Sequence, residues 1–492
     1  MRIVSQCASA LLAAGLLSSC ASNGVGGAVT AVSSGTVIRD VTVVDTRDGA
    51  LHRGQTLILD RGKIDRIITG PVRVTSTARL VDGSGKFVVP GYLDMHTHAI
   101  LSANNPVAPW PVLVAYGVTG VREMAGSAQL IEAARAINAA SAAGRLDAPE
   151  ILAMPGDILA APLTSEQAVQ RVRQQKAMGA DFIKIAGGSH DGTLAVLAEA
   201  TAQGLTVSGH MPLALPAGEA ADNGWHAIEH LGSGLGVVLD CSTDEAAVRA
   251  ALLRGEGARP PPPASMPLAI TSPMLFRAAD APFYQRAMEG YSDAKCEALA
   301  RRFVLRHTWQ VPTLIRLRTA AYSTAPQYRN DEALRYVDAQ TRALWEKLAL
   351  QYEATVPESA AATFQHYYAV QQRVVGMMAR EGVKMLAGSD LGGIWVIPGV
   401  ALHQEFRELS MAGVSALQIL QMTTLNGAKF LHRETSMGTV EEGKVADLVL
   451  LDANPLEDVG NLSRIAGVVL KGRYFDQAAL ARLKTSASPE RP

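Results

Sequence analysis

The sequence predicts an α/β protein: a (β/α)8 barrel with a small discontinuous β-sandwich domain that both ends of the chain build. Between residues 87 and 431, apolar strand-like runs followed by helical stretches recur eight times. Short β-branched strands separated by turns fill residues 36–86 and return over residues 432–476. A chain of 492 residues is also too long for one simple core, which favours a large domain plus a smaller one.

Residues 1–19 have the features of a targeting segment and are set apart from the fold. Arg2 supplies a positive start, and the apolar stretch that follows is ~15 residues long, shorter than the ~20 that a membrane span needs. Small residues precede Cys20, which resembles the lipobox of bacterial lipoproteins. This resemblance implies cleavage before Cys20, lipid on its sulfur, and an anchor in the bacterial cell envelope, at the outer membrane facing the periplasm. An ordinary secretory signal is the alternative.

The composition of the remaining chain sets further limits. Residues 20–35 are mostly Ser, Gly, Ala, Asn and Val, which predicts a flexible tether. The formal net charge is −1 and no basic stripe is present, so nothing favours a nucleic-acid partner. Membrane contact is expected through the N-terminal lipid only, and a homo-oligomer is left open. Once Cys7 is removed with the signal and Cys20 is lipidated, Cys241 and Cys296 remain, either as a disulfide or as two buried thiols.

The eight barrel runs lie at regular intervals through most of the central region. They cover residues 88–98, 117–123, 149–154, 180–185, 205–210, 225–230, 309–314 and 384–390. Helices are expected at 127–143, from Thr164 onward, at 192–203 and at 415–425, the second and fourth opening with capping boxes. Lys184 and His210 are 26 residues apart and His210 and His230 are 20 apart, close to the ~30 of one barrel unit. The long gap from His230 to Asp390 predicts insertions at about 240–305 and 318–381, the first carrying a proline-rich loop at 259–263.

Six side chains suited to metal binding lie at or just after these runs. His96 and His98 are two residues apart, which on a strand places both imidazoles on one face. Because barrel active sites form at the carboxyl ends of the strands, all six are expected to meet at one point. The set is His96, His98, Lys184, His210, His230 and Asp390. Four imidazoles and a carboxylate suit two Zn²⁺ ions.

Lys184 is the unusual member of this set. An ammonium group has no lone pair for a metal, and between Ile183 and Ile185 it would be a costly buried charge. Carboxylation by CO2 answers both difficulties, because a carbamate is an anion with two oxygen ligands. A single-metal site with a salt-bridged lysine is the alternative.

The pattern resembles the amidohydrolase superfamily of binuclear metal hydrolases, closest to its imidazolonepropionase-like and prolidase-like branch. The matching motifs are residues 90–98, 182–185, 209–210, 228–230, 388–390 and 438–448, and the likeness extends over about residues 36–475. The resemblance implies that His96, His98 and Asp390 hold one metal, that His210 and His230 hold the other, and that carboxylated Lys184 bridges them. It also implies a metal-bridging hydroxide as nucleophile, with Asp390 as general base and then general acid.

Hydrolysis of C–N amide or peptide-type bonds, in N-acyl amino acids or dipeptide-like substrates, is the activity that this likeness implies. Arg122, His307 and Tyr322 are candidate contacts for a substrate carboxylate, as are Arg316 and Arg318. One alternative is a cyclic-amide hydrolase or a deaminase of the same superfamily, although deaminases of this type usually use one metal and lack the lysine. A different alternative is a catalytically inactive surface lipoprotein that acts as a scaffold.

Overall fold

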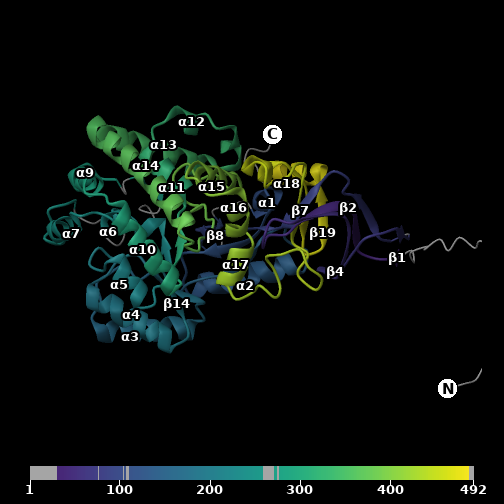
Figure 1. The fold of residues 1–492 in the computed structure, drawn as a ribbon, viewed down its shortest axis with the longest axis horizontal. Coiled ribbons are helices and arrows are strands. Elements are labelled where there is room, and N and C mark those ends of the chain that lie inside the picture. The colour runs from purple at the N-terminus through teal and green to yellow at the C-terminus, as the bar shows by residue number, and fades with distance from the viewer. Residues whose placement is uncertain are drawn as a thin grey trace, which may run out of the picture.

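The computed structural model describes residues 30–75, 77–102, 105–106, 110–258, 271–273 and 276–486. The targeting segment, Cys20, the first part of the expected tether and the proline-rich run at 259–263 lie outside these residues. Along the longest axis, the helix-rich barrel occupies one end and the strands of the small domain occupy the other (Figure 1).

Both ends of the chain contribute strands to the small domain. Its main sheet has the order β19-β18-β17-β7-β2-β3-β4, with β6 against β2. The strands are β2 Thr36–Val44, β3 Leu51–Asp60, β4 Lys63–Ile68, β6 Arg79–Asp82, β7 Phe87–Pro90, β17 Leu448–Leu451, β18 Ile465–Leu470 and β19 Arg473–Asp476. A separate parallel pair joins β1 Thr30–Val32 to β5 Val72–Val74. The two halves of the domain meet where β17 runs antiparallel to β7.

The chain crosses from this sheet into the barrel at Gly91, and here one expectation is wrong. Val88 and Val89 were expected to open the first barrel strand, but they pair with Leu450 and Val449 in the small domain. The barrel strand β8 starts only at Tyr92 (β8 Tyr92–Thr97). Gly91 allows the crossing, because a Cβ there would lie 2.1 Å from the hydroxyl oxygen of Thr119.

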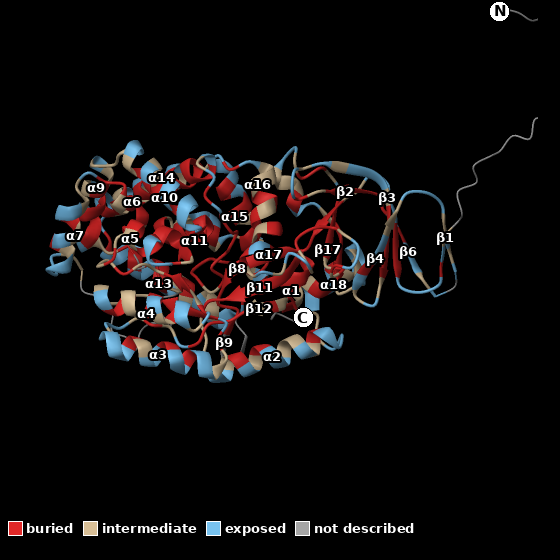
Figure 2. Cartoon of the chain, turned by 60° about the horizontal axis from the view of Figure 1, so that its bottom comes forward, coloured by how far each residue is buried: buried red, intermediate tan, exposed pale blue. Residues whose placement is uncertain are grey.

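Parallel strands form the barrel. They are β8, β11 Val118–Glu123, β12 Glu150–Ala153, β13 Phe182–Ile185, β14 Thr206–Gly209, β15 Ala227–Glu229 and β16 Trp309–Val311. Single bridges from Pro155 to Phe182 and from Leu159 to Ile185 connect the β12 side to β13. Residues 384–391 fill the eighth position as an extended segment, bridged at Met385 to β16 and at Leu391 to β8. The strands at the centre are buried (Figure 2).

Helices surround the strands, with one face of many of them exposed to solvent (Figure 2). They include α2 Ala128–Ala142, α3 Ser165–Met178, α4 His190–Ala202, α5 Ala217–Asp222, α10 Asp293–Arg306, α14 Glu358–Arg380, α15 Val400–Met411, α16 Ala416–Met422 and α17 Leu425–Phe430. The two predicted capping boxes are confirmed, at Thr164 with Gln167 and at Ser415 with Gln418. The short α1 Trp110–Ala115 packs against the last helix, α18 Gln477–Ser486.

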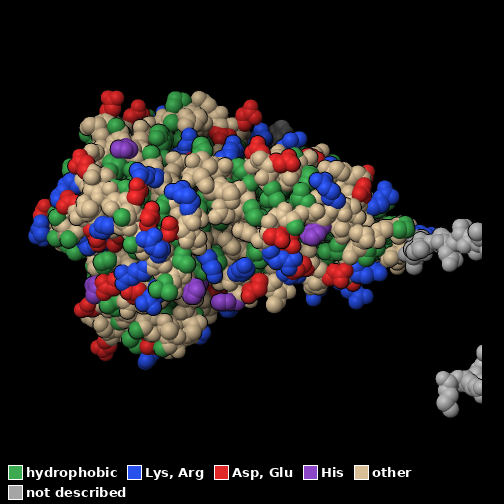
Figure 3. Space-filling view, viewed as in Figure 1, with side chains coloured by type: hydrophobic (Ala, Val, Ile, Leu, Met, Phe, Trp, Pro, Cys, Tyr) green, Lys and Arg blue, Asp and Glu red, His purple; other side chains and the backbone are tan. Residues whose placement is uncertain are grey.

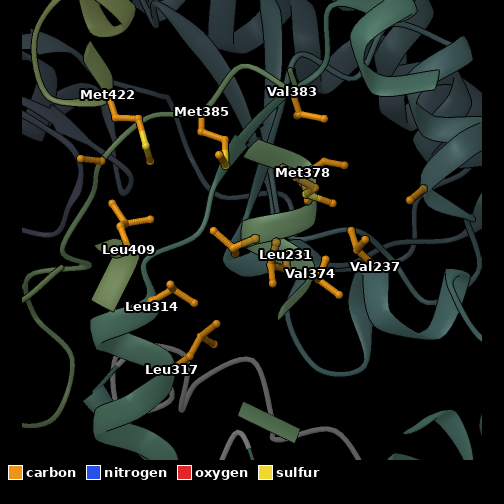
Figure 4. Close-up of a cluster of buried hydrophobic side chains, with 14 of the residues drawn as sticks. Leu231, Val237, Leu314, Leu317, Val374, Met378, Val383, Met385, Leu409 and Met422 are labelled. Carbon is orange, nitrogen blue, oxygen red and sulfur yellow. The ribbon is translucent and has the colours of Figure 1, made fainter. Parts of the chain in front are cut away.

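Long segments separate β15 from β16 and β16 from the eighth position. The first holds α6 Gly236–Asp240, α7 Glu245–Leu253 and α9 Ala281–Glu289 ahead of α10. Cys241, at the end of α6, forms a disulfide with Cys296 of α10. The second holds α11 Leu314–Ala321, α12 Pro326–Arg329 and α13 Ala339–Thr355 ahead of α14. Apolar side chains of α11, α14 and α15, among them Leu314, Met378 and Leu409, meet in the buried cluster of Figure 4.

The surface carries mixed charge. On the face drawn in Figure 3, acidic and basic side chains are interspersed, in keeping with the net charge of −1. Among the described residues, no helix has the length and apolar character needed to cross a membrane.

Candidate metal centre

The carboxyl ends of the barrel strands carry the predicted ligands. His96 is in β8 and His98 follows that strand directly, while Lys184 lies in β13. His210 follows β14 and His230 follows β15, each by one residue. Asp390 belongs to the extended segment in the eighth position. The topology therefore brings all six to one end of the barrel.

Three imidazoles converge on the carboxylate of Asp390. The Nε2 atoms of His96 and His98 lie 3.2 and 3.4 Å from its Oδ1. His230 Nε2 lies 3.8 Å from its Oδ2. One ligand atom each from His96, His230 and Asp390 falls within 4.8 Å of the other two, and all three residues are buried. This cluster has the residue types and the spacing of a metal site.

Neighbouring side chains fix which ring nitrogen faces the centre. Glu229 Oε2 lies 2.7 Å from His96 Nδ1, so the carboxylate accepts a hydrogen bond from the Nδ1–H group and leaves Nε2 with its lone pair free. His230 Nδ1 contacts the hydroxyl of Thr313, which places its Nε2 toward Asp390 in the same way. The fixed tautomer prepares both rings to bind a cation through Nε2.

His210 and Lys184 complete the cluster. The ring centroids of His210 and His230 are 4.9 Å apart. Burial lowers the pKa of His210 well below its ordinary value, and the charge of Lys184 lowers it further, so this ring is neutral and able to bind metal. Burial also lowers the pKa of Lys184 to about 8, against the opposing charges of Glu229 and Asp390.

Two of the ligands sit on left-handed backbone. His230 and Asp390 have φ angles of 54° and 56°, a conformation that costs a non-glycine residue on the order of 1 kcal/mol or more. Asp94 secures the second of these turns, because its carboxylate accepts hydrogen bonds from the amide and hydroxyl of Ser389, at 2.9 and 2.6 Å. Gly388 lets the turn approach β8, since a Cβ there would lie 2.8 Å from that of His96.

The carboxylate of Asp390 stays ionised despite its burial. Burial alone would raise its pKa, but the neighbouring imidazoles of His96, His98 and His230 hold that pKa well below its ordinary value. Arg316 adds a further positive charge, with Nε 3.2 Å from Asp390 Oδ2. The site therefore keeps an anion at its centre.

Arg122 is not a substrate contact, contrary to expectation. Its side chain is 0% exposed, and its guanidinium binds Glu229 Oε1 at 2.7 Å and the carbonyl oxygen of Met95 at 2.6 Å. The rings of Phe182 and Phe430 cover it. Arg122 thus supports the carboxylate that holds His96.

The other residues proposed to contact a substrate carboxylate lie in different parts of the structure. His307 caps the C-terminus of α10, is exposed, and precedes β16, so it lies at the opposite end of that strand from the metal ligands. Tyr322 follows the far end of α11 and packs edge-on against Tyr368. His307 is therefore not placed to contact a substrate at the metal ligands, whereas the role of Tyr322 stays a prediction. Arg318 pairs with Glu408 at 3.3 Å, and only Arg316 of the five reaches the described ligands.

Sequence reasoning did not assign roles to several residues that shape the site. Glu229 and Asp94 lie inside two of the recognised motifs, and Thr313 lies within the seventh run. Glu123 accepts hydrogen bonds from the Thr97 hydroxyl at 2.9 Å and from the Ala99 amide at 3.0 Å. A usable signal was present: an acidic residue inside an apolar strand must find a partner when it is buried.

The donor set fits a divalent cation. Among the described residues, the buried atoms His96 Nε2, His98 Nδ1, Lys184 Nζ and Asp390 Oδ1 have no hydrogen-bond partner. Buried polar atoms are normally paired, so a cluster of unpaired donors and acceptors around one carboxylate indicates a group that completes their bonding. Imidazole nitrogen and carboxylate oxygen are the ligands that Zn²⁺ prefers.

Comparisons with known proteins agree with this geometry. The model of the amidohydrolase family matches residues 355–474, which include Asp390. The bottromycin amidohydrolase superposes with a TM-score of 0.67 at 21% identity, covering 92% of this chain and 90% of that one. An Xaa-Pro dipeptidase with methionine bound in its active site gives 0.59 at 19% identity, covering 90% and 99%. A prolidase complexed with N-methylphosphonate-L-proline gives 0.60 at 21%, also covering 90% and 99%. No curated protein matches the sequence.

These comparisons show the fold of the chain. The chain has the fold of the solved amidohydrolases over about nine-tenths of its length, a TIM barrel with a β-sandwich domain, which confirms the predicted fold class. The amidohydrolase family model matches residues 355–474, less than half of the chain, and the solved structures show a shared fold over about nine-tenths of it.

Proposed function

We propose that this protein is a metal-dependent hydrolase that cleaves the C–N bond of N-acyl amino acids or dipeptide-like substrates. The observation that carries the proposal is the convergence of three Nε2 atoms on Asp390, two of them with the tautomer fixed by Glu229 and Thr313. A structural histidine cluster has no need of such preparation.

Two divalent ions, of which Zn²⁺ suits the donors best, would be held by the six predicted ligands. His96, His98 and Asp390 would hold one ion, His210 and His230 the other, and Lys184 both. When bound, such ions act as Lewis acids that make water a nucleophile near neutral pH and polarise a carbonyl group.

The state of Lys184 supports its role as a bridging ligand. The side chain is 2% exposed, and its Nζ has no hydrogen-bond partner among the described residues. With its pKa lowered to about 8, about a tenth of the amine is neutral at pH 7, far more than for an ordinary lysine. A neutral amine adds to CO2 and releases one proton, which yields a carbamate anion in place of an ammonium.

Asp390 would hold the proton that the reaction moves. Its carboxylate is ionised and could accept a proton from the attacking water, and its Oδ1 has no hydrogen-bond partner among the described residues. Return of that proton to the leaving nitrogen releases the amine and regenerates the carboxylate. His98 and His96 flank Oδ1 and orient it.

Similarity to known structures supports the substrate class. One similar structure is an Xaa-Pro dipeptidase with methionine bound in its active site, and another is a prolidase complexed with N-methylphosphonate-L-proline. A small molecule of dipeptide size is therefore the partner that we propose.

A substrate screen with Zn²⁺-loaded protein tests the proposal. N-acyl amino acids and dipeptides with C-terminal proline should be hydrolysed, and Lys184→Ala should lose most of the activity and regain part of it with a short carboxylate. His307→Asn, far from the ligands, is the matched control and should retain full activity. One bound metal with ammonia release would instead indicate a deaminase, and no metal with no turnover would indicate a scaffold.

We also propose that the chain is a lipid-anchored protein of the bacterial cell envelope. The support is the sequence around Cys20, which follows an apolar segment and small residues. Labelling with a radioactive fatty acid should mark the wild-type protein and not Cys20→Ser. Equal labelling of both would contradict the anchor.

A further inference from the structure

The segment of residues 230–236 has an unusual backbone. All of its residues except Leu235 have positive φ angles. Three of them are not glycine, with φ angles of 54°, 54° and 63° at His230, Leu231 and Ser233. This left-handed conformation is strained for a residue with a side chain, so the surrounding structure must hold the segment in place. Because His230 is a predicted metal ligand, whatever holds the segment also holds that ligand.

The helix at the end of this segment is too short to hold it alone. α6 (Gly236–Asp240) has 5 residues, whereas an isolated helix needs about 12–15 to be stable in water. At its start, the hydroxyl of Tyr367 in α14 donates a hydrogen bond to the carbonyl oxygen of Leu235 at 2.6 Å. At its end, Cys241 forms the disulfide with Cys296 of α10, and both cysteines are 0% exposed. A covalent bond therefore fixes α6 to a helix of 14 residues.

Two backbone hydrogen bonds accompany the disulfide. The amide of Ser292 donates to the carbonyl oxygen of Cys241 at 3.0 Å, and the amide of Thr243 donates to that of Gly290 at 2.7 Å. The two cysteines are 55 residues apart in the sequence, so the disulfide restricts a long stretch of chain between them. Without the covalent bond, only these weaker contacts would join the end of α6 to the start of α10.

The same region also holds the segment that follows His210. Asp240, at the end of α6, accepts a hydrogen bond from the amide of Ala217 at 3.1 Å and pairs with Arg249 of α7 at 3.0 Å. The guanidinium of Arg249 also donates to the carbonyl oxygen of Leu213. Leu213 and Ala217 follow His210 by three and seven residues. Anchoring α6 therefore supports both of the histidines that are predicted to hold the second metal ion.

The ligands predicted for the first metal ion have supports from other elements. Asp94 holds the turn at Asp390 through Ser389, with hydrogen bonds of 2.9 and 2.6 Å. Glu229 holds the ring of His96 at 2.7 Å. Asp94 belongs to β8 and Glu229 to β15, so both supports come from barrel strands. The disulfide should therefore matter more for the second ion than for the first.

We propose that the Cys241–Cys296 disulfide positions His210 and His230, so that the second metal ion binds tightly only when the disulfide is formed. The proposal rests on the proposed metal-dependent function and adds a dependence on oxidation. Formation of the bond converts two thiols into one disulfide, while the two electrons and two protons pass to a disulfide reagent that becomes two thiols. The metal centre is then complete only in protein that has matured in an oxidising compartment.

Metal titration of wild type and the double variant Cys241→Ala/Cys296→Ala tests the proposal. Metal-free protein is titrated with Zn²⁺ against a chromogenic chelator, which gives an affinity for each ion. The double variant should bind the first ion as wild type does and the second about ten- to a hundredfold more weakly, the range found when groups that orient metal ligands are removed. Leu480→Ala, which removes a buried side chain of α18 beside the small domain, is the control (Figure 1). It should bind both ions as wild type does.

Hydrogen–deuterium exchange followed by mass spectrometry shows where the disulfide acts. In the metal-free double variant, peptides that cover residues 210–217 and 230–240 should exchange faster than in wild type. Peptides that cover residues 92–98 and 384–391 should exchange at the wild-type rate. Faster exchange confined to residues 242–295, or an equal acceleration throughout the chain, overturns the proposal.

The possible results separate this proposal from the proposed function. Wild-type affinity for both ions in the double variant overturns the proposal and leaves the metal-dependent function standing, and so does an equal loss for both ions. If wild type itself binds fewer than two Zn²⁺ ions, the proposed two-ion centre fails, and the exchange experiment decides whether the disulfide positions His210 and His230. If the double variant does not fold, Asp240→Asn carries both measurements, because it keeps the disulfide and weakens the contacts of α6 with Arg249 and Ala217. A selective loss of the second ion in Asp240→Asn supports the proposal, and unchanged binding overturns it.

Discussion

Two regions around the candidate metal centre use buried arginines in opposite ways. In the floor of the site, which we define as Met95, Arg122, Glu229 and His96, each charged group is matched within the protein. In the wall, defined as Ser272, Arg316, Asp390 and Gly393, the guanidinium shares its carboxylate with three imidazoles. Both arginines are almost completely buried, so burial does not show what each one does. Their partners differ: Arg122 contacts Glu229, which supports a ligand, whereas Arg316 contacts Asp390, which is itself a predicted ligand.

The wall should govern chemistry, and replacing its carboxylate should have the largest effect. Asp390→Asn removes both a predicted ligand and the proton carrier, so kcat/KM should fall by about a thousandfold or more. Steady-state kinetics on the best substrate measure this, with His307→Asn as control. Activity within tenfold of wild type would contradict the role of Asp390.

The floor should govern stability. Arg122→Met leaves Glu229 as a buried anion without its cationic partner, which should lower the free energy of unfolding by about 3–5 kcal/mol. Urea unfolding measures the change. The double variant Arg122→Met/Glu229→Gln should recover part of the loss, because the uncompensated charge is gone. A loss below about 1 kcal/mol for Arg122→Met would show that the floor pair is not what stabilises this region.

Glu229 connects the floor to the metal ligands through His96. Glu229→Gln keeps the shape but removes the charge that the Nδ1 proton of His96 faces, so metal affinity should fall by about ten- to a hundredfold. Competition with a chromogenic chelator measures the affinity. Glu150→Gln, which alters a partly exposed pair with Arg433, is the control and should bind metal as wild type does. Unchanged metal affinity in Glu229→Gln would contradict the proposed role of Glu229 in orienting His96 toward the metal.

Glu405 gives a smaller, pH-dependent effect next to the wall. Burial raises the pKa of its carboxyl group from 4.5 to about 8, so the folded protein favours the protonated form. This contribution to stability is complete below about pH 4.5 and is lost as the pH rises toward about 8, by at most about 1.4 kcal/mol per pH unit. Glu405→Gln stays neutral throughout, so its stability should fall less steeply over that range than that of wild type. The melting temperatures of both proteins are measured by thermal unfolding from pH 5 to pH 8. If they fall equally steeply with pH in wild type and Glu405→Gln, the predicted effect of Glu405 is contradicted.

Sequence periodicity was sufficient where the barrel units are short. The runs that end at Lys184, His210 and His230 follow one another closely, and the structure places them in adjacent parallel strands. At Val88 and Val89, periodicity could not show which sheet the strand joins, because an apolar run suits either buried position. Val88 and Val89 belong to the small domain because they pair with β17, a contact between segments more than 350 residues apart in the sequence.

For the site too, local sequence patterns predicted some features and could not predict others. Ligand residue types and strand ends could be recognised locally, but the partners of Arg122, Arg316 and Tyr322 depend on which distant segments pack against them. Arg122 finds Glu229 from β15, and Arg316 finds Asp390 from the eighth position. Only the closed barrel brings those pairs together, so five similar candidates for binding a carboxylate could not be ranked from the sequence.

Metal stoichiometry tests the central claim most directly. Protein loaded with Zn²⁺, freed of excess metal by gel filtration and analysed by mass spectrometry, should contain about two ions per chain. Lys184→Ala should contain fewer, while His307→Asn should match wild type. Wild-type protein that binds no Zn²⁺, or Lys184→Ala that keeps the full complement, would contradict a centre in which Lys184 joins the four histidines and Asp390.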